Sequence, residues 1–505
     1  MLEAISQFMS DLPLLSLLII SLPVGAALIW IVPNARHART IALITALVDL
    51  VIAFMVLMKF DPANPGYQLT EKTEWIPTLN IHYSLGIDGI SVLFLPLTIL
   101  LFIGVMAASW NQVRHMTRLF YSLMLLLEST TIGVFCALDT ILFFLFWELA
   151  LIPLFFLISL WGIGADRRFA AVKYTLFMLI GGVPLLFGFI LLAFTQATGS
   201  GVEFFNHLNF DYTSLVTSNI APDVQVAVFF LLLLGFAIKT PVFPLHTWLP
   251  VVAMEGPVAV MALVTGLKLG AYGLIRFVVP LSPDAALQFH WLLAGLGVFG
   301  ILYGALVAMR QTNLRKMLAF SSMSHVGLVI LGIASFTING IQGAVFQLLN
   351  FIIVSGGLFL MVSFLHARVG TTDIIGLGGI ARTMPLLTAG FFVFGIASMG
   401  IPGTNGFPAE FLIIASALKQ HTGAGLAALV GVILTAGYFL NIYRQAFLGP
   451  VTSNIVATAI DLRKREIAII IIFGIYIFIT GFHPNFILDI TRTASESWLA
   501  HVVHP

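Results

Sequence analysis

Five ionisable side chains stand within apolar stretches of the sequence, where a charged group is expensive. These residues form an ionisable series: Glu148, Lys239, Lys268, His325 and Glu410. Ionisable side chains at membrane depth are rare and mark proton or ion pathways. Histidine titrates near neutrality, and buried lysine and glutamate titrate closer to neutrality than exposed ones. The series is therefore a candidate proton relay, and a set of static buried ion pairs is the alternative.

Other polar residues in the same stretches have weaker assignments. His246 follows Pro244 and either extends the relay or packs at a helix end. Asp139 is placed to cap the helix that carries Glu148. Asp49 and Glu128 also lie within expected spans, and no role is assigned to them.

The stretch from Gly235 to Pro250 must position Lys239. It follows an apolar run and contains Pro241 and Pro244, which remove backbone donors and interrupt a helix. The freed backbone groups tolerate membrane depth only if they face protein or water. A lysine at this interruption is a functional candidate, and a lysine reaching out to a lipid headgroup is the alternative.

A second interruption, from Gly395 to Glu410, resembles the first. The two begin 160 residues apart, a distance that spans five expected helices, so the second copy enters from the opposite side. Paired broken helices in an inverted repeat indicate a transport site at their interface. Chance similarity between two Gly/Pro-rich segments is the alternative.

The composition predicts an all-α polytopic membrane protein. The 505 residues are 59% hydrophobic and only 9% charged, against roughly 25% charged in soluble domains. Hydropathy predicts about fourteen helices. They are expected near residues 12–32, 38–58, 85–109, 118–137, 139–161, 171–197, 224–252 (broken), 256–280, 285–308, 318–337, 341–366, 385–420 (broken), 423–447 and 466–490.

Charge and cysteine usage exclude several functions. The 23 Lys and Arg balance 22 Asp and Glu, so there is no nucleic-acid footprint. A single cysteine, Cys136, excludes a four-cysteine iron–sulfur site, so electron transfer belongs to other chains or to a bound organic cofactor. No Walker A, Rossmann, His-Glu-x-x-His or Gly-x-Ser-x-Gly motif supports ATP-driven transport or hydrolysis. Lys and Arg gather in the odd-numbered loops, which predicts that these are cytoplasmic and that both termini are periplasmic.

Six stretches together resemble the antiporter-like subunits of respiratory complex I and of multisubunit cation/proton antiporters. Within these families they are most similar to the M-type branch of bacterial NADH–quinone oxidoreductase. The stretches are 85–91, 146–149, 237–250, 267–276, 321–327 and 402–410. The resemblance implies two inverted five-helix units at 118–280 and 281–448, each with a proton half-channel. Residues 1–117 would hold three N-terminal helices, and 449–505 the last loop and helix.

The resemblance also implies roles for the series and its surroundings. Glu148 and Lys239 would be a modulating pair, Lys268 and His325 the central relay, and Glu410 the exit. The subunit would hold no cofactor or metal itself. NAD, FMN, iron–sulfur clusters and quinone would be bound in partner subunits, beside other membrane subunits in a bacterial inner membrane.

Three departures from the family pattern keep rival functions open. Val251-Val-Ala253 stands in place of Asp-Ala-His, and the interval from Pro257 to Lys268 looks two residues short. Asn350-Phe-Ile-Ile353 stands where a His-Gly-Leu is expected. One rival is a subunit of a complex that is not driven by NADH, such as a cation/proton antiporter, a hydrogenase or an inorganic-carbon uptake complex. The other is a stand-alone secondary transporter, which predicts a solute-sized cavity beside the first interruption.

Overall fold

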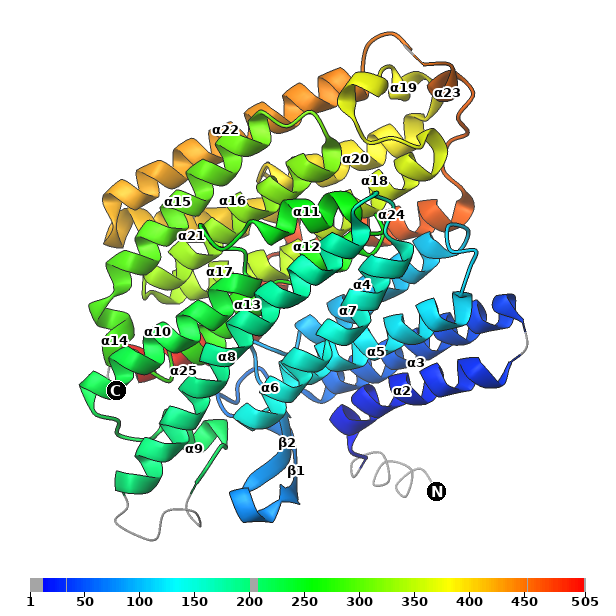
Figure 1. Ribbon diagram of the computed structural model, residues 1–505. Helices are drawn as coiled ribbons and strands as arrows, with labels where there is room; N and C mark the ends of the chain where they lie inside the picture. Colours follow the sequence, from blue (N-terminus) through cyan, green and yellow to red (C-terminus); the bar gives the residue numbers. More distant parts are fainter. Residues whose placement is uncertain (1–11, 33, 200–207, 452, 504–505) are drawn as a thin grey trace.

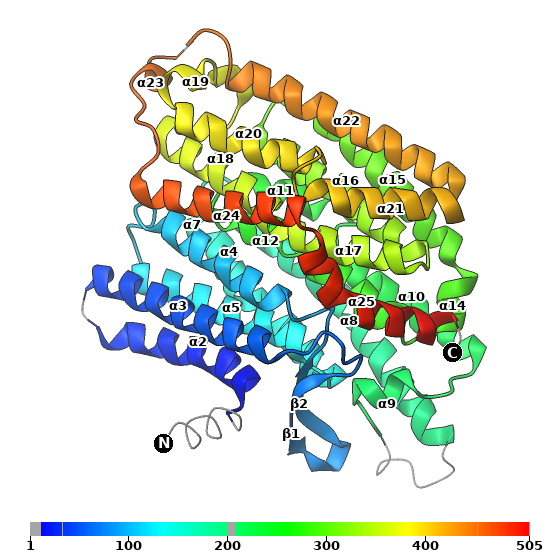
Figure 2. The same ribbon diagram turned by 180° about the vertical axis from the view of Figure 1, so that it is seen from behind.

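The protein is a bundle of tilted helices that runs from α2 and α3 at one edge to α22 at the other (Figures 1 and 2). The computed structural model describes residues 12–32, 34–199, 208–451 and 453–503. Twelve of its helices are long and apolar enough to cross a membrane, and two shorter apolar helices, Phe94–Ser109 and Pro385–Ser398, join them. This confirms the predicted all-α membrane fold.

The N-terminal part consists of three helices and a short β-hairpin. Its elements are α2 (Leu14–Ile31), α3 (Ala35–Lys59), β1 (Gln68–Ile76), η1 (Pro77–Leu79), β2 (Ile81–Ile87) and α4 (Phe94–Ser109). The two strands pair antiparallel, with Ile76 opposite Ile81. The prediction of a helix from residue 85 was wrong at its start, because β2 continues to Ile87 and the helix begins at Phe94.

The next helices hold the first three members of the series. They are α5 (Thr117–Cys136), α6 (Thr140–Leu149), α7 (Leu151–Trp161), α8 (Arg167–Gly199), α9 (Tyr212–Val216), α10 (Pro222–Lys239), α11 (Trp248–Glu255), α12 (Met261–Gly266), α13 (Leu269–Gly273) and the π-helical η3 (Leu274–Val278). Asp139 caps α6 by accepting hydrogen bonds from the amides of Ile141 and Leu142, as predicted. Pro153 cannot donate to the carbonyl of Leu149, which explains why α6 and α7 are separate.

A second set of helices holds His325 and Glu410. They are α14 (Pro283–Gln288), α15 (His290–Met309), α16 (Leu314–Ala334), α17 (Ile338–Asn350), the π-helical η4 (Phe351–Ser355), α18 (Gly356–Val369), η5 (Ile374–Gly376), α19 (Ile380–Thr383), α20 (Pro385–Ser398), α21 (Gly406–Gln420) and α22 (Thr422–Ala446). The residues between α10 and α11 form the first break, and those between α20 and α21 form the second. Both interruptions were predicted.

The C-terminal part differs from its prediction. After α23 (Asn454–Ala457), α24 (Lys464–Phe482) ends eight residues before the expected limit, and a further helix, α25 (Asn485–Val503), follows. This last helix crosses the back of the bundle to α14 (Figure 2). The indole of Trp498 donates to the carbonyl of Ile275, which ties α25 to η3.

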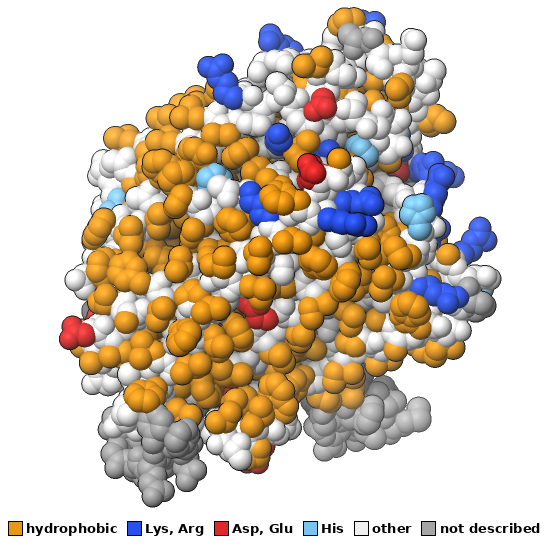
Figure 3. All heavy atoms as spheres, viewed as in Figure 1, with side chains coloured by type: hydrophobic (Ala, Val, Ile, Leu, Met, Phe, Trp, Pro, Cys, Tyr) orange, Lys and Arg blue, Asp and Glu red, His pale blue; other side chains and the backbone are white. Residues whose placement is uncertain are grey.

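The surface agrees with a protein embedded in lipid. Apolar side chains cover most of the face in Figure 3, and the Lys and Arg side chains lie toward its upper and right parts. The β-hairpin and α9 extend from the lower edge in Figure 1. On this face the cationic residues therefore lie away from the hairpin.

Candidate proton pathway

Lys239 is the last residue of α10 and lies against Trp147, the neighbour of Glu148. Its Nζ donates to the carbonyl of Trp147 at 3.3 Å and sits 3.7 Å from the centre of the indole ring. Such a position stabilises an ammonium by a cation–π interaction. The ion pairs of the described residues do not include Glu148 with Lys239, although the two groups are close enough to interact electrostatically. The expected modulating pair is therefore in an open arrangement.

Glu148 points toward α8 rather than directly at Lys239. A Cβ at Gly182 would meet Oε1 of Glu148, so a larger residue there would make the carboxylate shift. Oε1 is buried and has no hydrogen-bond partner among the described residues. The side chain also lines an apolar groove of about 500 Å³ between α6, α7 and α8. This carboxylate is thus able to change partners when its surroundings move.

The first break satisfies its own backbone groups with protein partners. The indole of Trp248, on α11, donates to the carbonyl of Ile238 at 2.9 Å. The hydroxyl of Thr240 donates to the carbonyl of Phe236 at 2.6 Å. The interruption is therefore tolerated at membrane depth in the way expected for a broken helix.

Lys268 occupies an interruption that the sequence did not reveal. The expected continuous helix 256–280 is broken: α12 ends at Gly266, Leu267 is extended, and α13 begins at Leu269. A Cβ at Gly270 would come within 2.2 Å of the Thr240 hydroxyl, so α13 approaches the first break closely. Lys268 is 6% exposed, and its Nζ has no hydrogen-bond partner among the described residues. This lysine is held between the first break and η4.

Phe351 separates Lys268 from His325. Its ring centre lies 5.4 Å from Nζ of Lys268 and 6.2 Å from the imidazole of His325, which it meets edge-on. It begins the π-helical turn η4, where a regular helix had been predicted. The position at which a relay histidine was expected therefore does face both neighbours in the series.

A small polar cavity lies beside Phe351. It has a volume of about 30 Å³ and is lined by Ser321, Ser322, His325, Gln347 and Asn350, together with residues of η4 and of the two helix ends that flank the second break. A cavity needs roughly 10–15 Å³ of such volume, and two to four polar partners, to hold one water molecule. The cavity accordingly has room for water at the place where the sequence lacks the expected histidine.

His325 and Glu410 are brought together by the second break. Nε2 of His325 lies 3.7 Å from Oε1 of Glu410, and both side chains are about 6% exposed. The two ring nitrogens face the carbonyls of Ser321 and Ser398, each at 2.8 Å. Because a carbonyl only accepts, both nitrogens must carry hydrogen for both bonds to form. The geometry fits an imidazolium beside a carboxylate.

The second break supplies further carbonyls to this cluster. The amide of the Asn350 side chain donates to the carbonyl of Asn405 at 2.9 Å. Gly400 has a φ of +65°, and a Cβ there would lie 2.5 Å from Oε2 of Glu410. The left-handed backbone and the close carboxylate both require glycine at this position. Glu410 is therefore positioned by α21 and by the preceding turn.

His246 is separate from this cluster. Its ring stacks on Phe243, with centres 5.6 Å apart, and also contacts Tyr303 and Phe320. It is 6% exposed, and its Nδ1 has no hydrogen-bond partner among the described residues. These contacts favour the packing alternative, so its place in a relay stays a prediction.

Comparison with known proteins agrees with this architecture. A family profile described as "NADH:quinone oxidoreductase/Mrp antiporter, TM" matches residues 137–435. The chain is 36% identical over 473 residues to NADH-quinone oxidoreductase subunit M of Rhodobacter capsulatus, which covers 93% of this chain and 91% of that one. The chain belongs to the NADH:quinone oxidoreductase/Mrp antiporter family.

Solved structures of this family have the same fold. A chain in respiratory complex I from Thermus thermophilus with bound NADH aligns with a TM-score of 0.88 at 29% identity, covering 97% of this chain and 99% of that one. A chain in the Mrp complex from Dietzia sp. DQ12-45-1b aligns with a TM-score of 0.83 at 22% identity, with the same coverage. The second likeness concerns the fold alone.

One buried ion pair was not predicted from the sequence. Arg276, in η3, donates to both carboxylate oxygens of Asp88 at 2.6 and 2.7 Å, and also to the hydroxyls of Tyr67 and Tyr272. Both charged side chains are less than 10% exposed. Each lies in a stretch that carried the family resemblance. The sequence did contain one signal for this pair, because charged residues within apolar segments need a partner of opposite sign.

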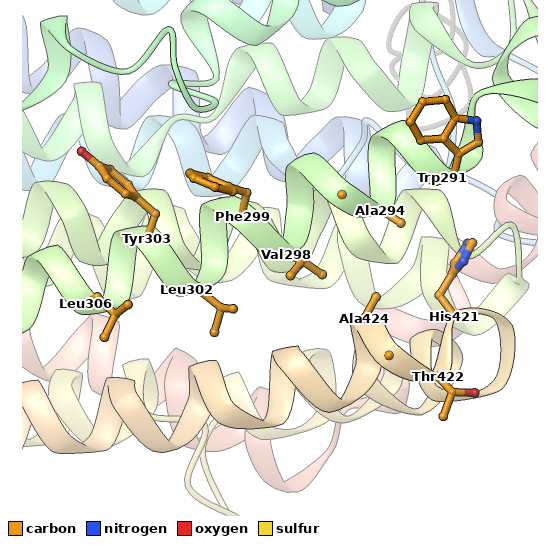
Figure 4. A pocket seen from close by; sticks show the side chains of 12 residues that line it. Trp291, Ala294, Val298, Phe299, Leu302, Tyr303, Leu306, His421, Thr422 and Ala424 are labelled. Atoms are coloured by element: carbon orange, nitrogen blue, oxygen red, sulfur yellow. The ribbon is translucent and has the colours of Figure 1, made fainter.

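A wide surface groove lies away from the series. It runs between α15 and α22, has a volume of about 670 Å³ and is lined mainly by apolar residues, including Trp291, Phe299 and Leu306 (Figure 4). His421 and Thr422 stand at one end, and no Lys, Arg, Asp or Glu lines it. Its exposed aromatic wall is suited to contact with lipid or a neighbouring helix rather than to a polar solute.

The described residues contain no group of three or more His, Cys, Asp and Glu placed to hold a metal ion. The expectation that redox cofactors are bound by partner subunits stays a prediction.

Proposed function

We propose that the ionisable series is the path by which this M-type membrane subunit of NADH–quinone oxidoreductase moves protons. One observation carries the proposal: all five side chains lie partly or fully buried at or beside interrupted helices. Interruptions of this kind provide carbonyls, cavities and small movements at membrane depth. Electrons pass from NADH to quinone in other subunits of the complex.

Coupling would begin at the pair of Glu148 and Lys239. The carboxylate and the ammonium are apart in this structure, and the ammonium is held by Trp147. Movement of Glu148 toward Lys239 would stabilise the charged lysine, and movement away would release its proton. The groove beside Glu148 is where a neighbouring subunit would act on that carboxylate.

The proton would then pass from Lys268 to Glu410 by way of His325. Water in the cavity beside Phe351 would replace the expected histidine, with Gln347, Asn350 and two serines as its partners. Glu410 lies 3.7 Å from His325 and would accept the proton before release. The two five-helix units, 118–280 and 281–448, would each contain one half of this path.

We also propose a location and partners for this chain. The chain is a multi-pass membrane protein of a complex I assembly, and its loop charges support cytoplasmic odd-numbered loops with both termini on the periplasmic side. NAD, FMN, iron–sulfur clusters and quinone would be held by other subunits. The second candidate, a subunit of a complex not driven by NADH, is motivated only by Val251 to Ala253 and Phe351, which depart from the expected pattern. The similarity to subunit M and to a chain of respiratory complex I favours the NADH-driven assignment.

Purification through a tag on this chain, in mild detergent, tests the assignment to the complex. Mass spectrometry of the co-purifying proteins should find flavin-binding and iron–sulfur subunits, and the preparation should reduce quinone with NADH. Recovery of antiporter-like membrane chains alone, or of a soluble zinc protein, would contradict the NADH-driven assignment. It would favour the second candidate.

A further inference from the structure

Two buried carboxyl groups in the N-terminal helices lie outside the ionisable series. Asp49, in the middle of α3, and Glu128, in α5, are both 0% exposed. Neither takes part in the ion pairs formed by the described residues. Buried charges are normally paired, because an unpaired buried charge lowers the free energy of unfolding by roughly several kcal/mol. These two carboxyls therefore need a different explanation.

Hydrogen bonds between helices place the two carboxyls at the same depth. The hydroxyl of Ser21, in α2, donates to Oδ1 of Asp49 at 2.8 Å. The hydroxyl of Ser129, next to Glu128, donates to the carbonyl of Ile19 at 2.7 Å, two residues from Ser21. The two carboxyl groups also interact electrostatically. Asp49 and Glu128 consequently face a common site between α2, α3 and α5.

The site contains unused hydrogen-bonding atoms. Oδ2 of Asp49 and both carboxyl oxygens of Glu128 are buried without a hydrogen-bond partner among the described residues. Two ionised carboxylates cannot persist side by side in an apolar site, and a shared proton removes the repulsion. A proton on either carboxyl would also provide the donor that these oxygens lack. The chemistry of the site is thus that of a proton-binding pair.

A second group of polar side chains stands at the hairpin end of α2. Ser16 lies five residues before Ser21, about 7.5 Å along the helix. Its hydroxyl contacts both the carboxylate of Glu71, in β1, and the hydroxyl of Tyr83, in β2, the latter at 3.1 Å. The Glu71 carboxylate also accepts from the amides of Leu15 and Ser16. Ser16, Glu71 and Tyr83 thus form a separate polar group that is closed on itself by these hydrogen bonds.

Few other titratable groups surround the pair. The helices α2, α4 and α7 contain none that is ionisable near neutral pH. Glu148 of α6 faces Gly182, and His82 of β2 contacts the carbonyl of Asn80. Cys136 ends α5, beyond Glu128, and is buried. The cationic residues of α3 and α5 themselves lie ten or more positions along the helix from Asp49 or Glu128; they are Arg36, His37, Arg39, Lys59 and Arg118.

We propose that Asp49 and Glu128 form a proton-binding dyad in the N-terminal helices, separate from the ionisable series. At least one of the two carboxyls holds a proton, and Ser21 donates to the Asp49 member of the pair. The proposal does not depend on the series carrying protons across the membrane.

Infrared difference spectroscopy of the assembled complex, between acidic and alkaline buffer, tests the dyad. The parent complex should show a protonated-carboxyl C=O band that Glu128→Gln removes and that Asp49→Asn removes or shifts. Glu74→Gln, at an exposed position of β1, is the matched control and should leave the band unchanged. The band should persist in a Lys239→Met complex, which separates this result from the fate of the series.

Three outcomes would overturn the dyad. One is a C=O region of the spectrum that neither Glu128→Gln nor Asp49→Asn alters. Another is a pair of independent bands, in which each substitution removes one band and leaves the other unchanged. The third is loss of the band when sodium replaces choline at constant pH, which would assign the site to a metal cation. If a carboxamide variant does not assemble, Ser21→Ala retains both carboxyls and should shift the band; an unshifted band would contradict the proposal.

Discussion

Phe351 is the residue that most clearly distinguishes this chain from the expected pattern. A phenyl ring cannot transfer a proton, but this one borders a polar cavity and lies between an unpartnered lysine and a histidine. The departure in sequence therefore removes a titratable group without closing the path. In the proposed path, water in the cavity and the hydrogen-bonding side chains around it would take over the role of the histidine.

We expect Phe351→His to be tolerated. An imidazole is smaller than the phenyl ring, can bond to the polar cavity and restores a titratable group between Lys268 and His325. The complex should assemble at the parent level and pump protons as well as the parent does. Phe351→Ala is the matched variant and should lower stability by about 3–5 kcal/mol through the cavity it creates.

Two measurements check this prediction. Native electrophoresis measures assembly, and NADH-driven proton uptake in vesicles measures pumping. Failure of Phe351→His to assemble would show that the position is packed as an apolar site and that water does not replace the histidine there.

The ion pair between Asp88 and Arg276 should be essential for stability. Asp88→Asn leaves a buried guanidinium without its carboxylate, and breaking a buried pair in this way costs about 3–5 kcal/mol. The amount of assembled complex should fall sharply. Adding Arg276→Met removes the unpaired charge and should recover part of the loss. Parent-level assembly of Asp88→Asn alone would mean that the tyrosines beside Arg276 suffice.

At the scale of elements, the interruptions of helices determine where the series can work. Pro241 and Pro244 in the first break, and Pro402 in the second, made two interruptions predictable, because proline removes a backbone donor. The separation of α6 from α7 at Pro153 was not predicted, since residues 139–161 were expected to form one helix. The interruption at Lys268 contains no proline. It depends on the close approach of Gly270 to Thr240 and of Gly266 to η4, which are contacts between distant segments. Local sequence therefore revealed the first kind of interruption and not the second.

The cap of α6 offers a test of local stability. Asp139→Ala removes two hydrogen bonds to amides of α6 and a third to His82, which should cost about 1–2 kcal/mol. Cys136, the single cysteine, is buried three residues before the cap. Its reaction with a thiol reagent should become about 5- to 30-fold faster. Asp139→Asn retains an acceptor and should react at nearly the parent rate; equal rates in Asp139→Ala and the parent would argue against the cap.

At the scale of the whole molecule, composition and hydropathy were sufficient to predict a membrane protein with about fourteen spans. They were not sufficient for the β-hairpin, whose strand Gln68–Ile76 is largely polar and exposed, or for α25, whose packing depends on Trp498. The members of the series could be named because charges are rare in apolar segments. Their distances could not, since these depend on how α10, α13, η4 and α21 meet.

The pairing of Asp88 with Arg276 illustrates the same limit. Each residue was visible in the sequence, but 188 positions separate them. Only the fold brings η3 beside the segment between β2 and α4. Sequence alone indicates that such charges need partners and does not say which partner each one has.

The central claim is that this subunit moves protons through its buried ionisable side chains. NADH-driven proton pumping by the complex in sealed vesicles tests it most directly, with Lys239→Met compared with Lys419→Met at an exposed position in the last turn of α21. We predict that Lys239→Met assembles and loses coupled pumping, whereas Lys419→Met pumps as the parent does. Normal pumping by the Lys239→Met complex would contradict the account.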